Sequence, residues 1–332
     1  MSGAGRQKLK LLYIYKILYE NTNEENVLNA VQLISKLKGY GISAERKSIY
    51  DDIETLISFG VDILTVKGRN SGYYIASREF ELPELALLAD AVASSKFITE
   101  KKSAELIKKI TALTDKWNAG KINRQIFMLN RTKNKNEQIY YNIDKIHEAI
   151  SENRQVSFLY FEFDTDKNIV YRRGGTRYTA SPYALCWDDE YYYMIAYYER
   201  YNRVVNFRAD RMERIEILNH PRQGEAQKEG FNPVQYASRL FSMFVGETQR
   251  VRLEFSNRLI GVALDRFGYD SFIEKRENDR FAIIADVAIS SAFLGWLFQF
   301  GDDVKILSPD SLKEQMKNQA EKIAGIYLDK NK

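Results

Sequence analysis

The chain has 332 residues, which is long for one domain, so we expect two or three domains. Its net charge of +4 permits nucleic-acid binding without requiring it. With one cysteine, Cys186, and two histidines, His147 and His220, the chain cannot form an intrachain disulfide framework or a cysteine-rich zinc site. Neither histidine lies in a catalytic motif, so we expect no metal, no cofactor and no enzymatic activity.

The sequence also shows no signal for membrane insertion or export. No apolar run approaches the ~20 residues that a membrane-spanning helix needs. The first residues, MSGAGRQKLK, lack the apolar core of a signal peptide. We therefore expect a cytoplasmic protein of bacterial type.

The first 80 residues predict three helices followed by a β-hairpin. Apolar residues at helical spacing, and short apolar runs around a glycine-bounded turn, place helices at 8–20, 27–37 and 44–59 and strands at 63–66 and 73–75. Ser43 is a plausible N-cap of the third helix, and Gly60 is a plausible C-cap. This order is typical of a winged helix-turn-helix, which we expect to span residues 1–80.

Winged helices contact DNA with the first turns of the third helix and with the hairpin tip. The candidate DNA-binding residues are Arg46, Lys47, Ser48, Asp51, Lys67, Arg69 and Asn70. Asp51 gains nothing from a phosphate, although a carboxylate can accept a hydrogen bond from cytosine in the major groove. Two alternatives stay open: a solvated helix face in a module that does not bind DNA, and an ordinary polar turn at the hairpin tip.

Residues 81–138 predict a helical linker between two domains. A helical section starts at Pro83, and residues 121–135 are polar and basic enough for a connecting stretch. Between residues 100 and 135, ten Lys and Arg stand against three Asp and Glu. This surplus indicates either a solvated linker or a surface that faces phosphates.

Residues 139–222 predict one helix followed by about five short strands. The expected elements are a helix at 139–151 and strands near 156–163, 177–180, 191–198, 204–208 and 214–218. A helix with five short strands suggests a small Sm- or SH3-like β-barrel.

The strand at 191–198 is the most aromatic part of the chain. Because side chains alternate along a strand, Tyr193 and Ile195 should share one face, while Tyr192 and Met194 share the other. A turn at Asn202 then returns the chain, so that one tyrosine face ends beside Arg208. Guanidinium groups beside phenol rings favour phosphate or carboxylate binding. The alternative is that the tyrosines form barrel core and the arginines form structural salt bridges, with Asp210 as one partner.

Residues 176–218 resemble the WYL domain of bacterial transcription regulators. The triplet YYM at 192–194 stands where the family has Trp-Tyr-Leu, and FRADRM at 207–212 is similar to its Phe-Arg-Leu-Asp-Arg-Ile block. The SPYAL and NFRADRM spacing supports this likeness. The resemblance implies a small barrel that binds an effector, which we expect to be anionic: a nucleotide or a short nucleic acid. The candidate ligand-binding residues are Tyr160, Tyr183, Tyr193, Asn206, Arg208 and Arg211.

The segment 42–75 resembles the DeoR-type N-terminal domain that usually precedes WYL domains. The run SAERKSIYDDIETL replaces the family's Arg-rich Thr-Ile-Tyr-Arg-Asp-Ile run, and Asp51 stands where the family commonly has arginine. The same resemblance implies a further domain of the WCX type at the C-terminus.

Residues 230–332 predict the order strand, helix, strand, strand, helix, strand and a final helix. This order is typical of a ferredoxin-like split βαβ fold. Ser290 or Ser291 should cap the apolar helix that ends at Phe298. We expect that helix to bury against its own sheet, with a second protomer as the alternative.

Together these patterns predict an α+β chain that acts as a ligand-responsive transcription regulator. Paired winged helices read symmetric half-sites, so we expect a homodimer on palindromic duplex DNA. The alternative is an accessory module of a defence system that binds RNA, single-stranded DNA or another protein. Aromatic side chains beside arginines suit single strands.

Overall fold

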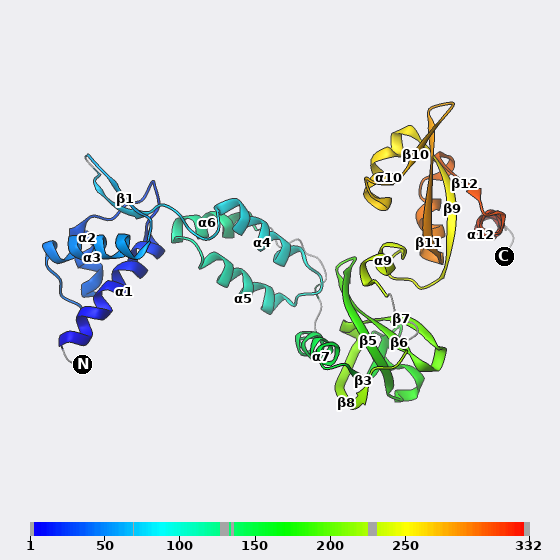
Figure 1. Cartoon of the computed structure of the whole chain (residues 1–332), viewed down its shortest axis with the longest axis horizontal. Coiled ribbons are helices and arrows are strands. Elements are labelled where there is room, and N and C mark those ends of the chain that lie inside the picture. The colour runs from blue at the N-terminus through cyan, green and yellow to red at the C-terminus, as the bar shows by residue number, and fades with distance from the viewer. Residues whose placement is uncertain (1–2, 69, 127–132, 134–135, 225–230, 329–332) are drawn as a thin grey trace. The chain divides into compact units, whose positions relative to one another are not determined.

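A computed structural model describes residues 3–68, 70–126, 133, 136–224 and 231–328 (Figure 1). The chain divides into two compact units, residues 1–135 and 136–332. Helix and sheet are both abundant, with a helical region first and sheets dominating the second unit. Within the part of the chain that the structure describes, no helix has the length and apolar character needed to cross a membrane.

The first unit starts with three helices and a two-stranded hairpin around one apolar core. The elements are α1 (Gly3–Asn21), α2 (Ala30–Lys38), α3 (Arg46–Phe59), β1 (Ile63–Val66) and β2 (Gly72–Ile75). Ile14, Leu33, Ile49 and Ile63 come from four of these elements, and all are buried. Helical spacing predicted the core-facing positions of Ile14 and Ile49, but not that of Leu33 in α2.

A short stretch before α2 extends the hairpin. The backbones of Leu28 and Tyr73 exchange two hydrogen bonds, with N···O distances of 3.1 and 2.9 Å. Gly72 permits this approach, because a Cβ there would lie 2.8 Å from the carbonyl carbon of Leu28. The hairpin thus gains a third strand-like segment from between the first two helices.

The start of α3 differs from the prediction, whereas its end does not. Helix α3 begins at Arg46, and its N-cap is Glu45, which makes no side-chain capping bond. Ser43 is not the cap, because the chain is still non-helical there and stays extended through Glu45. Gly60 ends the helix as predicted, in the left-handed conformation with φ 106°.

The rest of the first unit is helical. Its helices are α4 (Leu82–Ser94), α5 (Glu100–Thr111) and α6 (Lys116–Gln125). The predicted connecting stretch at 121–135 is therefore wrong at its start, because α6 continues to Gln125. Lys133 is not a solvated charge: its Nζ donates to Ser95 O at 3.1 Å and Ser103 Oγ at 2.7 Å, and burial lowers its pKa. Residues 127–132 and 134–135 lie outside the described residues.

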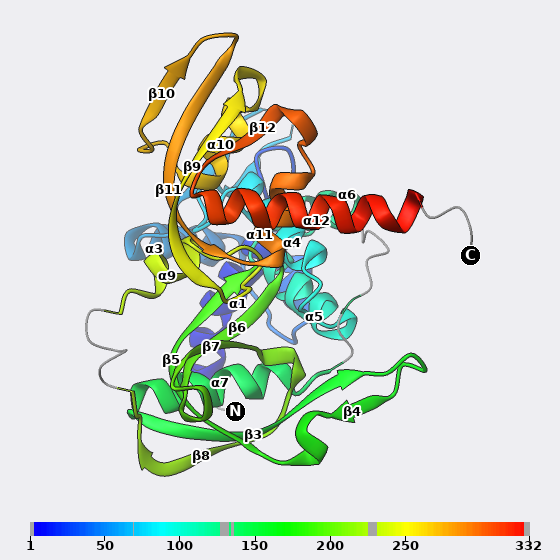
Figure 2. The same ribbon diagram turned by 90° about the vertical axis from the view of Figure 1, so that its right-hand side faces the viewer.

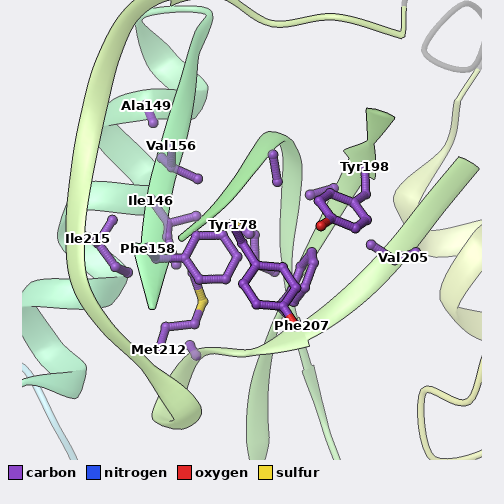
Figure 3. Packing of buried hydrophobic residues seen from close by; sticks show 14 residues of the cluster. Ile146, Ala149, Val156, Phe158, Tyr178, Tyr198, Val205, Phe207, Met212 and Ile215 are labelled. Carbon is purple, nitrogen blue, oxygen red and sulfur yellow. The ribbon is translucent and has the colours of Figure 1, made fainter. Parts of the chain in front are cut away.

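The second unit begins with a helix on a curled sheet. The elements are α7 (Ile139–Ser151), β3 (Arg154–Phe163), β4 (Ile169–Tyr171), β5 (Tyr178–Asp188), β6 (Tyr191–Tyr198), β7 (Arg203–Arg208) and β8 (Met212–Pro221). The strand order is β4-β3-β5-β6-β7, and β8 pairs with β3. Figure 3 shows the core, in which Phe158, Tyr178 and Phe207 pack beside Ile146 of α7.

Two strands of this sheet differ from the prediction: β5 is longer than expected, and β4 was not expected. We expected this strand only near residues 177–180. The structure continues β5 through Pro182 to Asp188 and shifts the register between Pro182 and Ala184. Strand β4 was not predicted at all.

The last part of the chain contains the predicted order of elements. After α9 (Pro233–Ser238) come β9 (Glu247–Ser256), α10 (Ile260–Phe267), β10 (Ile273–Arg276), β11 (Arg280–Ile289), α11 (Ser291–Phe298), β12 (Val304–Ser308) and α12 (Asp310–Leu328). The strands are ordered β10-β11-β9-β12, and every pair is antiparallel. Figure 2 shows α12 in red, extending past the sheet.

The apolar helix α11 packs on its own sheet, as expected. Ser290 caps it by accepting a hydrogen bond from the backbone N–H of Phe293 at 3.2 Å. Phe293 and Leu297 are buried in a core that also contains Phe255 of β9. The expected packing of this helix on its own sheet is therefore confirmed.

Candidate functional site

The side chains of β6 alternate between two environments, as predicted. Met194, Ala196 and Tyr198 lie in the core of the curled sheet. Tyr193 and Ile195 lie on the opposite face and belong to a separate apolar cluster. Both faces of β6 are thus apolar: the inner face lies in the core of the curled sheet, and the outer face packs in a cluster with residues from outside the sheet.

Strand β7 brings Arg208 to that outer face. In the β6–β7 pair Tyr193 stands opposite Arg208, and Ile195 stands opposite Asn206. The turn between the strands ends at Asn202, which has a left-handed φ of 48°. The predicted convergence of Tyr193 and Arg208 is therefore present.

Arg208 is held in one orientation by a carboxylate and a ring. Its Nε and Nη2 donate to the two Asp210 oxygens at 3.1 and 2.8 Å. Its guanidinium carbon lies 3.6 Å from the ring centroid of Tyr191. Burial by itself lowers the pKa of Arg208, but the hydrogen bonds and charge of Asp210 reverse this effect and raise the pKa. The result is a permanently charged, pre-oriented guanidinium that is one quarter exposed.

Tyr160 links this arginine to its basic neighbours. The Tyr160 hydroxyl accepts a hydrogen bond from the backbone N–H of Arg208 at 3.2 Å. Burial raises the pKa of Tyr160, and the charges of Arg211 and Arg208 oppose this rise. Because the phenol stays protonated, it keeps a proton to donate toward an anion.

Arg211 supplies charge that no neighbouring carboxylate cancels. Among the described residues it has no carboxylate within ion-pair distance, whereas Arg208 is paired with Asp210. Its guanidinium lies 5.9 Å from the ring centroid of Phe163, which is 56 % exposed. The site therefore combines one fixed arginine with one unpaired arginine beside an exposed ring.

Tyr183 and Asn206 contact a different part of the chain. We call residues 231–246 the connector. The Asn206 amide donates to the carbonyl of Met243 at 2.8 Å. The Tyr183 hydroxyl lies 2.6 Å from the carbonyl of Gly224. The six predicted ligand residues thus fall into two groups: Tyr160, Tyr193, Arg208 and Arg211 lie near one end of the sheet, whereas Tyr183 contacts Gly224 and Asn206 contacts the connector.

Sequence reasoning missed two further arginines. Arg172 and Arg173 lie in a short 3-10 turn, residues 172–175, that follows β4. Arg173 donates to the Tyr198 hydroxyl at 2.6 Å, and the guanidinium of Arg172 lies 5.8 Å from the ring centroid of Tyr160. The signal was the run Arg-Arg-Gly-Gly, in which glycines mark a turn that presents adjacent cations.

The predicted DNA-binding residues lie mostly on the surface of the first unit. Arg46, Lys47, Asp51, Lys67 and Asn70 are exposed, and Arg69 lies outside the described residues. Ser48 is half-buried and accepts a hydrogen bond from Lys10 Nζ at 3.2 Å. The predicted exposed face of α3 is therefore present except at Ser48.

The described residues offer no recognisable metal centre. They contain no group of three or more His, Cys, Asp or Glu side chains that could hold an ion. His147 and His220 are both exposed. Asp210, the carboxylate at the candidate site, is committed to Arg208.

Comparisons with known proteins identify two domains. Residues 141–217 match the WYL domain, and residues 247–324 match the WCX domain. The chain therefore contains both domains that the sequence patterns resembled. All six predicted ligand-binding residues lie within the WYL match.

No curated protein matches the chain. Among solved structures, it is similar to proteasome accessory factor B/C (PafBC) of Arthrobacter aurescens, with 20 % sequence identity and a TM-score of 0.30. That match covers 93 % of this chain and 47 % of the PafBC chain. This chain thus spans about half the length of that protein.

Proposed function

We propose that this chain is a ligand-responsive transcription regulator. It binds duplex DNA through its first unit and senses an anionic effector, a nucleotide or short nucleic acid, in its WYL domain. The observation that carries the proposal is the Arg208 guanidinium, fixed by Asp210 over the Tyr191 ring inside a WYL domain. A pre-oriented guanidinium beside phenol groups suits a phosphate.

The order and pairing of the helices and strands support the domain folds that this function requires. Helices α1–α3, the Leu28–Tyr73 bridge and the β1–β2 hairpin fit a DeoR-type winged helix-turn-helix over residues 1–80. Helices α4, α5 and α6 fit the helical linker that we propose over residues 81–138, and the curled sheet of residues 139–222 fits a small Sm- or SH3-like barrel. The antiparallel order β10-β11-β9-β12 fits a ferredoxin-like domain over residues 230–332.

Duplex binding is tested with fragments of the gene's own promoter region. Lys47→Ala removes an exposed cation from the first turn of α3, so we expect weaker binding and a shallower dependence on salt. Lys101→Ala, an exposed lysine on α5, is the matched control because it removes the same charge elsewhere in the unit. Absence of duplex binding at low salt would sink the regulator proposal.

We also propose a homodimer on palindromic DNA. The support is the single winged-helix-like unit per chain, because such units read symmetric half-sites in pairs. Analytical ultracentrifugation with one and with two half-sites gives the stoichiometry. One chain bound to a complete palindrome would refute this part.

A second function is favoured by the exposed aromatic side chains around the arginines. The guanidinium carbon of Arg211 lies 5.9 Å from the ring centroid of Phe163, and that of Arg203 lies 5.6 Å from the ring centroid of Tyr201. Exposed rings beside guanidinium groups suit base stacking along a single strand. An RNA or single-stranded-DNA-binding module of a defence system would bind single strands tightly and promoter duplex weakly, which a parallel mobility-shift assay distinguishes.

A further inference from the structure

The connector covers the outer face of β6 and β7. Ile195 is fully buried there, and Tyr193 and Val204 pack beside it. The covering side chains are Phe231, Tyr236, Ala237, Leu240 and Met243. Arg208, the register partner of Tyr193, remains one quarter exposed. The cover and the candidate anion site therefore meet at Tyr193.

Asn206 fastens this cover. Its amide N–H donates to the Met243 carbonyl at 2.8 Å, and its amide oxygen accepts from the Tyr236 hydroxyl at 3.3 Å. Asn206 lies two residues before Arg208 and so points to the same face of β7. One strand thus carries both the anion-binding arginine and the fastening residue.

The turn that Asn206 holds is strained. Ser242 and Met243 have φ angles of 48° and 58°, although neither is glycine. Left-handed backbone costs a residue with a side chain about 1 kcal/mol. Such turns persist where the surroundings impose them, and they concentrate at switch regions. Here the Asn206 bond and the burial of Met243 impose the conformation.

The connector is also attached to the WCX-containing domain. The Arg239 carbonyl accepts a hydrogen bond from the backbone N–H of Ala288 in β11 at 2.8 Å. Arg266 of α10 donates to the Leu240 carbonyl. Leu240 and Ala288 are buried in the same apolar cluster as Ile195. A displaced connector would therefore change how the C-terminal domain is held to the WYL domain.

We propose that the connector is a displaceable cover of the effector site, latched by Asn206, so that its closure competes with anion binding at Tyr193 and Arg208. This inference rests on the proposed function and adds the regulation of the same site. A base or ring that stacks on Tyr193 needs the face that the connector's apolar side chains occupy. By thermodynamic linkage, closure of the connector lowers the affinity for the ligand, and ligand binding destabilises the closed connector by the same factor. Effector binding would thereby loosen the C-terminal domain.

Two substitutions should shift ligand affinity in opposite directions. Asn206→Ala removes the latch, and the loss of its two hydrogen bonds should tighten binding about five- to thirtyfold. Ser242→Gly relieves the left-handed strain at an exposed position, so closure becomes more stable and binding weakens about two- to fivefold. Asn278→Gly is the control, because Asn278 has φ 57° and is exposed in the β10–β11 turn, away from the cover.

The experiment measures binding of fluorescein-labelled oligo(dT), and of inorganic pyrophosphate by calorimetry, to the full-length variants. Hydrogen exchange of residues 236–244 is followed in the same proteins, with and without oligo(dT). We expect faster exchange in Asn206→Ala, slower exchange in Ser242→Gly and no change in Asn278→Gly. Oligo(dT) should speed exchange of this segment in the wild type.

The outcomes separate this inference from the proposed function. Equal binding by wild type and Arg208→Gln means that the effector site is misplaced, and the proposed function fails. Binding that depends on Arg208 but is unchanged in both Asn206→Ala and Ser242→Gly overturns the cover alone. Binding by Asn206→Ala where the wild type shows none supports a closed cover. If no variant binds either probe, both the proposed cover and the proposed function are overturned.

Discussion

Asp210 accepts two hydrogen bonds from the side chain of Arg208, which lies only two residues before it in the chain. This contact holds the guanidinium group in one orientation. The distances are 3.1 and 2.8 Å, and the Asp210 side chain is 11 % exposed. A carboxylate so placed orients the guanidinium and cancels part of its charge. Net positive charge at the site must then come from Arg211, which has no carboxylate within ion-pair distance among the described residues.

This pair predicts separable effects on stability and binding. Arg208→Gln should abolish Arg208-dependent oligo(dT) binding, a loss of about 2–5 kcal/mol. It should also destabilise the second unit by about 1–3 kcal/mol, because the two hydrogen bonds from Arg208 to Asp210 are lost. The double variant Arg208→Gln/Asp210→Asn should recover much of the stability without recovering binding. Chemical denaturation and calorimetry measure the two quantities. Recovery of binding in the double variant would show that Arg208 is only structural.

A second prediction concerns Asp51 on the exposed face of α3. Replacing this carboxylate with arginine should strengthen binding to duplex DNA at low salt, because a repulsive charge becomes an attractive one. If the new side chain reaches a phosphate, the slope of log K against log salt should steepen by about 0.9. Asp90→Arg, an exposed site on α4, gives the same charge change away from this face. Equal gains in both variants would indicate a nonspecific charge effect.

A third prediction concerns stability at high pH. Burial raises the pKa of Tyr193 and of Tyr236 to about 12, whereas tyrosine in an unfolded chain titrates near 10. Below pH 10 both states hold the proton, so these tyrosines add no pH dependence. Between about pH 10 and 12 the unfolded state releases protons first, so the free energy of unfolding must fall as pH rises. Urea unfolding across this range gives the slope.

The Tyr236→Phe variant serves as the internal check on that slope. It lacks one of the two late-titrating phenols and its bond to Asn206, so it should be less dependent on pH than the wild type over the same range. Titration of tyrosinate absorbance provides the second measurement. If the free energy of unfolding depends on pH equally in Tyr236→Phe and the wild type, and both phenols titrate near pH 10, the burial of Tyr193 and Tyr236 is contradicted.

Two glycine substitutions in the first unit should act in opposite directions. Gly72→Ala places a methyl group 2.8 Å from the Leu28 backbone, so we expect a loss of about 1–3 kcal/mol of stability. Gly120→Ala lies within α6 with no atom within 4 Å of the new Cβ, and should stabilise the unit by about 0.5–1 kcal/mol. Thermal unfolding measures both. A neutral Gly72→Ala would show that the segment around Leu28 is not part of the hairpin.

Most of the elements followed from local signals in the sequence. Helical spacing placed α1–α3 and α11, Gly60 ended α3, and Ser290 capped α11. Local signals failed where a remote partner decides the conformation. Pro182 stays inside β5 because a bulge opposite β6 accommodates it. Lys133 is half-buried because its ammonium group donates to groups at α4 and α5, some 30 to 41 residues earlier.

By itself, the sequence determined which side chains can share a face, because alternation along a strand and spacing along a helix are properties of neighbouring residues. It therefore predicted the two tyrosine faces of β6 and the approach of Arg208 to Tyr193. Only the tertiary structure decided what each face meets. Asn206 contacts the Met243 carbonyl 37 residues later in the chain, and Arg173 contacts the Tyr198 hydroxyl, so these roles depend on packing between segments that no local pattern encodes.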